Sequence, residues 1–351
     1  MSNGSKLEDM PHQILAENIW LYVSPVLLLI GTVGNILVII VLSRKQMRIS
    51  TSSIYMICLA FSDLGVLYTG LPRQWLRRFG IWNDDSNEYV YTDLRAFTEA
   101  GCKFHIFMLY YFQHMSTYIL ICFSWERVIA VYFPFRLKEI CTRLTVFLCL
   151  LSTAFLLLIF NGHFFWTYQL SIKKLLYPPF KEIRFCEPKD KDFRLLWRQI
   201  HMWAGSFVPF IIMALLNGLI IFRLCLLKHK SAVRSTRPVG PTSATVTLFI
   251  VTVVFLLLTA PMAHYYYYVA ASKGLWYDVN DVRNLASRNL HFAIVNMLLY
   301  LNSAINFLLY SVSSSKFHKE LTSLCCRQRS VETRATKAQC RALPTARLSH
   351  M

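Results

Sequence analysis

Apolar runs that are nearly free of charge recur seven times along the chain, and each is near or above the ~20 residues that a helix needs to cross a bilayer. They occupy residues 19–42, 49–72, 102–134, 144–172, 199–222, 242–272 and 289–315. Periodicity alone does not separate a spanning helix from a buried core helix, but length and scarcity of charge favour spanning. The pattern therefore predicts an all-α fold, a seven-transmembrane helix bundle.

The third run supports this prediction most clearly, because a cysteine lies at one of its ends and an acid–arginine pair near the other. No Asp, Glu, Lys or Arg lies between Lys103 and Glu126. A helix from Cys102 to Arg127 would rise ~37 Å at ~1.5 Å per residue, against ~30 Å of hydrocarbon. One helix would therefore place a cysteine at one membrane face and an acid–arginine pair at the other, which favours a membrane receptor over a soluble enzyme.

Polar segments flank the seven runs. Residues 1–18 are polar and mixed in charge, unlike a cleavable signal peptide, so we expect the first apolar helix to act as its own insertion signal. Residues 316–326 carry apolar side chains at helical spacing, which predicts a short amphipathic eighth helix on the membrane. Cys325 and Cys326 in it are candidates for palmitoylation, with free thiols as the alternative. Residues 327–351 are basic and polar, and we expect a disordered cytoplasmic tail.

The charge distribution predicts the orientation of the bundle. The sequence is 55% apolar with a mean hydropathy of +0.40, so its charge of +18 does not indicate a nucleic-acid partner as it would in a soluble protein. The first, third and fifth connections and the tail hold 20 Lys and Arg against four acids, whereas the other side holds 17 against 14. An excess of basic residues marks the cytoplasmic side, so residues 1–18 are expected to be extracellular. Asn3 begins the only glycosylation sequon of an outer segment.

The ten cysteines lack the paired spacing of a metal site. Four of them lie inside apolar runs, where a thiol behaves as a small hydrophobe: Cys58, Cys122, Cys149 and Cys225. With the N-terminus outside, Cys102 and Cys186 are the two cysteines on the oxidising side. A disulfide between them is therefore expected, with two free thiols as the alternative.

The order and spacing of several residues resemble those of one receptor family. An acid–arginine pair follows Cys102 by 24–25 residues, Asp63 lies in the second run, and Asn306-x-x-x-Tyr310 lies in the seventh. Together with the seven runs and the cysteine pair, these features resemble a rhodopsin-like (class A) G-protein-coupled receptor over about residues 19–326. The resemblance implies a plasma-membrane receptor, not an enzyme, that binds an extracellular ligand and activates a heterotrimeric G protein.

Glu126-Arg127-Val128 resembles the family's Asp-Arg-Tyr. The implied role is an arginine that its neighbouring carboxylate holds at rest and that is later released toward the G protein. Pairing also lowers the cost of a cation near low dielectric. The alternative is an interfacial arginine whose head group reaches back to water.

Asp63 is a carboxylate near mid-bilayer, which by default marks a functional position. The family pattern surrounds it with Asn35, Ser116, Asn302 and Asn306, and all four are present. The resemblance implies that this cluster binds an allosteric sodium ion at rest, and no other cofactor is expected. The alternative is a protonated Asp63 satisfied by amide neighbours.

The chain departs from the family pattern at several positions. Three residues of the family's switch are retained: Pro209, Phe255 and Pro261. Thr259 stands where the family usually has Trp, and Asn217 stands where it usually has Tyr. Asn306 is followed by Phe307 rather than proline, so we expect the proline kink of the seventh run to be missing.

Two residues that other classes of ligand require are absent from the sequence. Leu109 stands where amine receptors place an Asp, so a cationic amine would lack its counter-ion. Tyr300 stands where opsins need a Schiff-base lysine, which argues against light sensing. The residues expected to line the ligand site are His105, Met108, Leu109, Phe112, His264, Tyr265, Tyr268, His291, Asn296 and Tyr300.

Such an aromatic, mixed-charge mouth suits a peptide, and the chain is similar to invertebrate-type neuropeptide receptors, including those for amidated, FMRFamide-like peptides. Tyr265 to Tyr268 would alternatively form only an interfacial aromatic belt. A chemosensory receptor on the same fold is the closest alternative function. A transporter is disfavoured because the chain shows no paired halves with broken helices.

Membrane lipids and a G protein are the partners expected inside the cell. The basic residues of the inner rim are Arg136, Lys138, Arg143, Arg223, Lys228, Lys230, Arg234 and Arg237. Most of them are expected to contact anionic lipid head groups and some the G protein. Arrestin is a further partner of such receptors.

Overall fold

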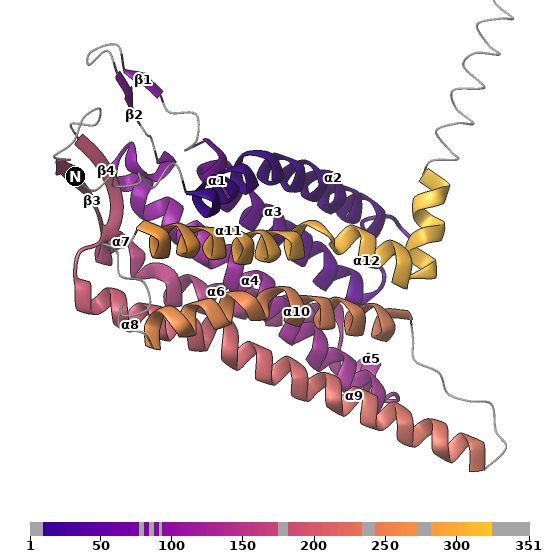
Figure 1. The fold of residues 1–351 in the computed structure, drawn as a ribbon. Coiled ribbons are helices and arrows are strands. Elements are labelled where there is room, and N and C mark those ends of the chain that lie inside the picture. The colour runs from indigo at the N-terminus through magenta and orange to yellow at the C-terminus, as the bar shows by residue number, and fades with distance from the viewer. Residues whose placement is uncertain are drawn as a thin grey trace, which may run out of the picture.

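In the computed structural model, long helices lie side by side and form one elongated bundle (Figure 1). The structure describes residues 10–76, 81–83, 88–90, 93–174, 182–233, 243–271 and 282–324. Two short hairpins lie at one end of the bundle, here called the hairpin end, and α5 (Leu137–Ile140) lies at the other, the α5 end. Asn3, Cys325 and Cys326 lie outside the described residues.

Within the described residues, six helices are long and apolar enough to cross a membrane, and one bent pair of helices makes a seventh. The first four spans and their connections are α1 (Pro11–Asn18), η2 (Ile19–Val23), α2 (Ser24–Leu42), α3 (Thr51–Leu76), β1 (Ile81–Asn83), β2 (Glu88–Val90), η3 (Leu94–Ala96), α4 (Glu99–Tyr132), α5, α6 (Arg143–Gly162), α7 (Phe164–Thr167), β3 (Tyr168–Lys174) and β4 (Glu182–Pro188). The remainder are α8 (Lys191–Met202), η4 (Trp203–Phe207), α9 (Val208–Val233), α10 (Ser243–Ala271), α11 (Val282–Ala304) and α12 (Asn306–Ser313). Residues 315–324 are also helical. The predicted all-α bundle is thereby confirmed.

The ends of several spans differ from those expected. The fourth run was expected to be helical to residue 172, but the chain becomes strand β3 at Tyr168 because Leu170 pairs with Cys186 of β4. The fifth span begins at Lys191 rather than 199, since the Asp190 carboxylate caps the helix by accepting from the Asp192 amide. The third span begins at Glu99 after a similar cap.

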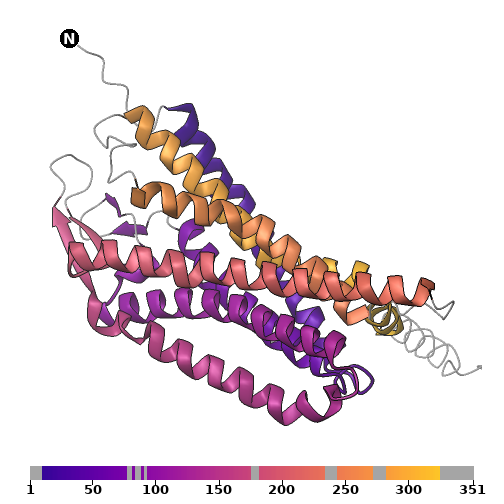
Figure 2. The same cartoon turned by 90° about the horizontal axis from the view of Figure 1, so that it is seen from below.

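Helix α4 is the centre of the bundle. It packs against α3, α6 and α9, and Figure 2 shows it between α6 and the longer α9. One large apolar cluster fills the inner part of the bundle, from Val38 on α2 to Phe255 on α10. The outward face of α6 remains apolar, with Phe147 and Leu151 more than half exposed, as a lipid-facing helix requires.

The seventh span is bent by 47° between α11 and α12, at Ile305. The expectation that a kink would be missing without proline is therefore wrong. The Asn35 side chain of α2 donates to the Ser303 carbonyl at 2.9 Å, just before the break. A side chain that enters the hydrogen-bond ladder of a helix is a known cause of bending, so Asn35 accounts for the kink without proline.

The predicted eighth helix is present over the described residues 315–324. Phe317 is almost fully buried, and its ring lies 6.1 Å from that of Tyr310. Leu321 and Leu324 pack against the same core cluster. Arg44, from the connection between α2 and α3, holds this helix through the Glu320 carboxylate at 2.9 Å. Its apolar face thus lies on the bundle.

Candidate functional site

At the α5 end of α4, Glu126 and Arg127 form a buried ion pair. The Arg127 Nη2 donates to the Glu126 Oε1 at 2.6 Å, and the Thr51 hydroxyl of α3 donates to the same oxygen at 2.5 Å. The two side chains are 2% and 7% exposed, and the Arg127 guanidinium also lies over the Phe123 ring, at 5.6 Å from its centroid. The geometry therefore holds the arginine against its own helix and α3.

The residue after this pair is apolar and packs on α9. Val128, the third residue of the predicted motif, packs with Leu216 and Ile220. Tyr310 of α12 is 2% exposed and packs on Phe317 of the eighth helix. Both predicted switch residues are therefore held by apolar contacts.

Asp63 lies fully buried at the centre of α3. The Ser116 hydroxyl of α4 donates to its Oδ1 at 2.9 Å, and the Asn306 amide of α12 donates to its Oδ2 at 2.6 Å. Asn35 instead donates to the Gly31 and Ser303 carbonyls. The structure thus brings two of the four predicted neighbours into direct contact with the carboxylate.

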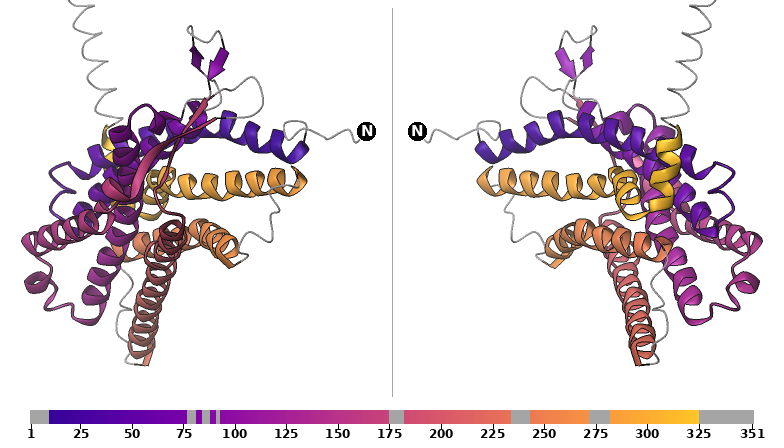
Figure 3. Two further views of the ribbon diagram at one scale, coloured as in Figure 1. Left: turned by 90° about the vertical axis from the view of Figure 1, so that its left-hand side faces the viewer. Right: turned by 90° about the vertical axis from the view of Figure 1, so that its right-hand side faces the viewer.

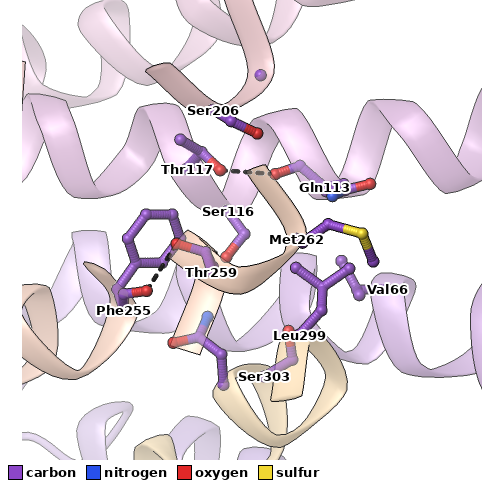
Figure 4. Close-up of a pocket in the computed structure, with 12 residues that line it drawn as sticks. Val66, Gln113, Ser116, Thr117, Ser206, Phe255, Thr259, Met262, Leu299 and Ser303 are labelled. Atoms are coloured by element: carbon purple, nitrogen blue, oxygen red, sulfur yellow. Dashed lines mark hydrogen bonds between the residues drawn. The ribbon is translucent and has the colours of Figure 1, made fainter. Parts of the chain in front are cut away.

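A cavity of about 30 Å³ lies beside Ser116, the residue that donates to this carboxylate (Figure 4). Ser116, Asn302 and Ser303 line it, together with Phe255 and Thr259 of α10. A space of this size holds one or two waters or a small ion. Hydroxyl and amide oxygens in its lining are donors that hard cations accept, and the Asp63 carboxylate lies one hydrogen bond away through Ser116, so the residues present fit a sodium ion.

Of the remaining switch positions, Phe255 lines the same cavity, and the others lie on the helices beside it. Pro209 is buried directly after the π-helical turn η4, and Phe255 is 6% exposed against the inner core. The Thr259 hydroxyl donates to the Phe255 carbonyl at 2.7 Å, one turn before Pro261. Asn217 donates to the Thr252 hydroxyl of α10 at 2.8 Å. The departures from the family pattern are thus hydrogen-bonded within the bundle.

The sequence reasoning missed a buried polar chain that joins three spans. Asn161 donates its amide to the Leu157 carbonyl, which leaves its Oδ1 facing His114 Nδ1 at 3.1 Å. In neutral rings, Nδ1 of His114 then carries the proton, and its Nε2 accepts from Nδ1–H of His201 at 3.1 Å. All three side chains are at most 2% exposed. In the sequence, these three residues stand out only as uncharged polar residues inside otherwise apolar runs.

Gly205 makes this chain possible. It lies in η4, one turn after His201, and a Cβ there would come within 2.9 Å of His201 Nδ1 and 3.0 Å of His114 Nε2. The Tyr118 hydroxyl of α4 donates to the Ala204 carbonyl of the same turn at 3.0 Å. We call the chain of Asn161, His114 and His201 the histidine clasp. It fixes the wide turn of the fifth span against α4.

Two of the predicted ligand residues on the third and seventh spans face α3. Phe112 packs on Gly65, and Tyr300 packs on Gly70, each where a Cβ would collide with the ring. His105, Met108 and Leu109 are half-buried. Asn296 donates to the carbonyl of Phe292 on its own helix. None of the ten predicted residues lines the cavity next to Asp63.

The predicted ligand residues of the sixth span differ in burial. Tyr265 is buried and meets the edge of His291 at 5.1 Å between ring centroids, so the structure brings these two together. His264 is exposed. The side chain of Tyr268 lies outside the described residues.

The predicted disulfide is present. Cys102 at the start of α4 is bonded to Cys186 of β4, and both are buried among Phe107, Phe164 and Trp197. The β3–β4 hairpin therefore lies across the end of α4, as the end view in Figure 3 shows.

Asp93 is a charged centre beside this hairpin. The Arg95 guanidinium pairs with its carboxylate at 2.6 Å, and Arg73 of α3 lies at 3.9 Å. Burial alone would raise the pKa of Asp93, but the hydrogen bonds and positive charge of Arg95, together with Arg73, hold that pKa well below its ordinary value. The carboxylate is therefore ionised at every physiological pH.

The arrangement of seven spans, a disulfide-linked hairpin and a buried acid–arginine pair defines a class of membrane receptor. Residues 34–310 match the 7 transmembrane receptor (rhodopsin family), and the chain belongs to this family. It is therefore a multi-pass membrane receptor rather than an enzyme, which confirms the family expected from the sequence.

Similar receptors come from worms and vertebrates. The chain is 26% identical to the FMRFamide peptide receptor frpr-18 of Caenorhabditis elegans over 319 residues, which cover 86% of the chain and 68% of that receptor. It is 25% identical to the thyrotropin-releasing hormone receptor of Bos taurus over 338 residues, covering 86% of the chain and 77% of that receptor. It is 28% identical to the galanin receptor type 2 of Rattus norvegicus over 144 residues, covering 41% and 35%.

Proposed function

We propose that this receptor lies in the plasma membrane with its N-terminus outside the cell, binds a secreted peptide at the hairpin end and activates a heterotrimeric G protein at the α5 end. The observation that carries this proposal is the buried Glu126–Arg127 pair at the end of α4 opposite the disulfide. The orientation follows from the excess of basic residues in the connections at the α5 end. Arrestin and anionic lipids are further partners proposed at that end.

The coupling step starts from an arginine that is held back. Arg127 is paired within its own helix, and Thr51 adds a second donor to Glu126. Breaking a buried pair leaves a charge without its partner, which typically costs about 3–5 kcal/mol. Release of Arg127 therefore needs a compensating contact, which the G protein would supply when ligand binding opens the α5 end.

A sodium ion next to Asp63 would stabilise the resting arrangement. Asp63, Ser116 and Asn302 would hold the ion, with Ser303 at the same cavity. When bound, the ion supplies a positive charge that offsets the buried carboxylate. Asn306 binds the carboxylate from α12, so the same acid links the ion site to the seventh span.

Peptide ligands are supported by the relatives. The similar receptors are named for FMRFamide peptides, thyrotropin-releasing hormone and galanin. The matches to the FMRFamide peptide receptor and to the thyrotropin-releasing hormone receptor each cover 86% of this chain. Leu109 occupies the position on α4 where amine receptors carry the Asp that pairs with a charged amine. Its apolar side chain argues against an amine ligand and so also favours a peptide.

The test is a library of secreted neuropeptides applied to cells that express this chain with a promiscuous G protein, read as calcium release. A saturable response to one peptide is expected, and Arg127→Ala is expected to abolish it without loss of surface protein. Lys45→Ala removes an exposed charge from the connection between α2 and α3 at the same end and serves as the matched control. Silence across the library, with the receptor confirmed at the cell surface, would contradict a peptide ligand and favour a chemosensory one.

A further inference from the structure

Four arginines gather at the hairpin end, and the established family role uses none of them. They come from α3, η3 and α8 and are defined here as the outer arginine cluster: Arg73, Arg95, Arg194 and Arg198. None lies free in solvent: the side chains of Arg73 and Arg95 are 12% and 16% exposed, and the other two are half-buried.

Two tyrosines at this end connect the members of the cluster. Tyr110 of α4 has Arg95, Arg198 and Arg73 as electrostatic neighbours. Tyr168 of β3 has Arg95, Arg194 and Arg198. Arg95 and the arginines of α8 therefore lie near the same two tyrosines. The hairpin β3–β4 lies between them, in contact with both η3 and α8.

The two halves of the cluster differ in their ion pairs. Asp93 pairs with Arg95 and Arg73. In the part of the chain that the structure describes, no ion pair joins Arg194 or Arg198 of α8 to a carboxylate. Partly desolvated guanidinium groups without a counter-ion are costly, so an anion beside these two arginines would be favourable.

The unpaired polar atoms of α8 are donors as well. Among the described residues, the buried Arg194 Nε and Trp197 Nε1 have no hydrogen-bond acceptor. Trp197 is only 5% exposed and packs against His163, with ring centroids 4.0 Å apart and ring planes tilted by 59°. Residues three and four apart on a helix share one face, so Arg194, Trp197 and Arg198 present their polar groups together. The Arg194 and Trp197 donors lack an acceptor within the described part of the chain, and the positive charge of the neighbouring arginines favours an acceptor that is an anion.

We infer that the ligand of this receptor carries a carboxylate, which docks on the outer arginine cluster and accepts from Arg194 and Trp197. Carboxylates match the fork of an arginine and form strong charge-assisted hydrogen bonds with it. The carboxylate would come from an acidic side chain or from a free C-terminus of the peptide. The inference rests on the proposed function, because it specifies the chemistry of the proposed ligand.

Small probes test the site without any signalling. Thermal unfolding of the purified receptor in detergent is measured with choline salts of N-acetylglutamate α-amide, which has a side-chain carboxylate, and of N-acetylglutamine, which has a terminal one. N-acetylglutamine amide is the neutral control. A rise in the unfolding temperature with one or both carboxylates, and none with the neutral probe, is expected. Equal effects of the charged and neutral probes would overturn the inference.

Substitutions place the effect at the cluster. Arg194→Gln and Arg198→Gln are expected to weaken carboxylate binding by about tenfold or more, the scale of a lost charged hydrogen bond, whereas Arg194→Lys retains part of it. Lys189→Gln removes one exposed charge from the same end and should bind like wild type. Glutamine variants that bind like Lys189→Gln would refute the site.

The two proposals fail in different ways. A receptor that binds the carboxylate probes through Arg194 but activates no G protein would contradict the proposed function and leave the site in place. A receptor that signals to a peptide equally well after every carboxylate of that peptide is converted to an amide would contradict the site alone. A drop in potency of about tenfold on amidation of one carboxylate is the expected result.

Discussion

Gly205→Ala tests whether the histidine clasp is as tight as the structure shows. The added Cβ would lie 2.9 Å from His201 Nδ1 and 3.0 Å from His114 Nε2, where the two nitrogens are hydrogen-bonded at 3.1 Å. Neither ring can move aside cheaply, because His114 is also held by Asn161 and both rings are buried. The substitution must therefore stretch the clasp or shift the wide turn of the fifth span.

The expected change in the free energy of unfolding of Gly205→Ala is the sum of opposing effects. Overpacking a buried site costs about 1–3 kcal/mol, and loss of the hydrogen bond adds about 1 kcal/mol. Replacing glycine by alanine in a helix returns about 1 kcal/mol. The net destabilisation of Gly205→Ala is therefore about 1–3 kcal/mol. Gly218→Ala, in α9 of the same span, meets no atom within 4 Å and should stabilise by up to about 1 kcal/mol.

Thermal unfolding of the detergent-solubilised receptor compares the two variants, with surface expression as a second readout. Gly205→Ala is expected to unfold below wild type and Gly218→Ala at or above it. In a His201→Ala background the penalty of Gly205→Ala should be smaller, because one of the two colliding rings is gone. A Gly205→Ala receptor as stable as Gly218→Ala, or a penalty that is undiminished without His201, would refute the reasoning.

Three further predictions concern the acids of the bundle. Thr51→Val removes one donor from Glu126 and should raise agonist-independent nucleotide exchange on the G protein; basal exchange equal to wild type would count against the held arginine. Asp63→Asn should abolish any dependence of agonist affinity on sodium against choline chloride, and a retained dependence would place the ion elsewhere. The lowered pKa of Asp93 stabilises the fold above the carboxyl's ordinary pKa, and this contribution is lost as pH falls below about 4. The difference in unfolding temperature between wild type and Asp93→Asn should therefore stay constant from pH 8 to about 5 and shrink below about 4; a difference that disappears near pH 6 would contradict the Arg95 pairing.

Much of the architecture could be predicted from the sequence because a bilayer restricts the choice. A long uncharged run has few alternatives to a spanning helix, and with the orientation fixed only Cys102 and Cys186 were available for a disulfide. Span ends were less predictable. Residues 168–172 carry no charge, like most of the helix before them, and the pairing of Leu170 with Cys186 makes them a strand.

The details of the site depended on partners far apart in the sequence. His114 lies 47 positions from Asn161 and 87 from His201, so no local pattern announces the clasp. The kink of the seventh span likewise depends on Asn35, 268 positions from Ser303, which is why the absence of proline was misleading. The orphaned donors of α8 were invisible for the same reason, since burial and pairing are properties of the folded chain.

The polar contacts of α4 explain how the two ends of this receptor can be coupled. His114 binds α8, Ser116 binds the acid of α3, and Glu126 binds Thr51. Two of these contacts are buried and the one at Thr51 is partly buried, and an unpaired buried polar group costs about 1–3 kcal/mol. Small displacements of α8 or α3 relative to α4 therefore leave donors unpaired until a second set of contacts forms. Such a bundle favours discrete arrangements over gradual deformation, so a carboxylate that draws α8 toward the hairpin would act on Arg127 by breaking contacts along one helix.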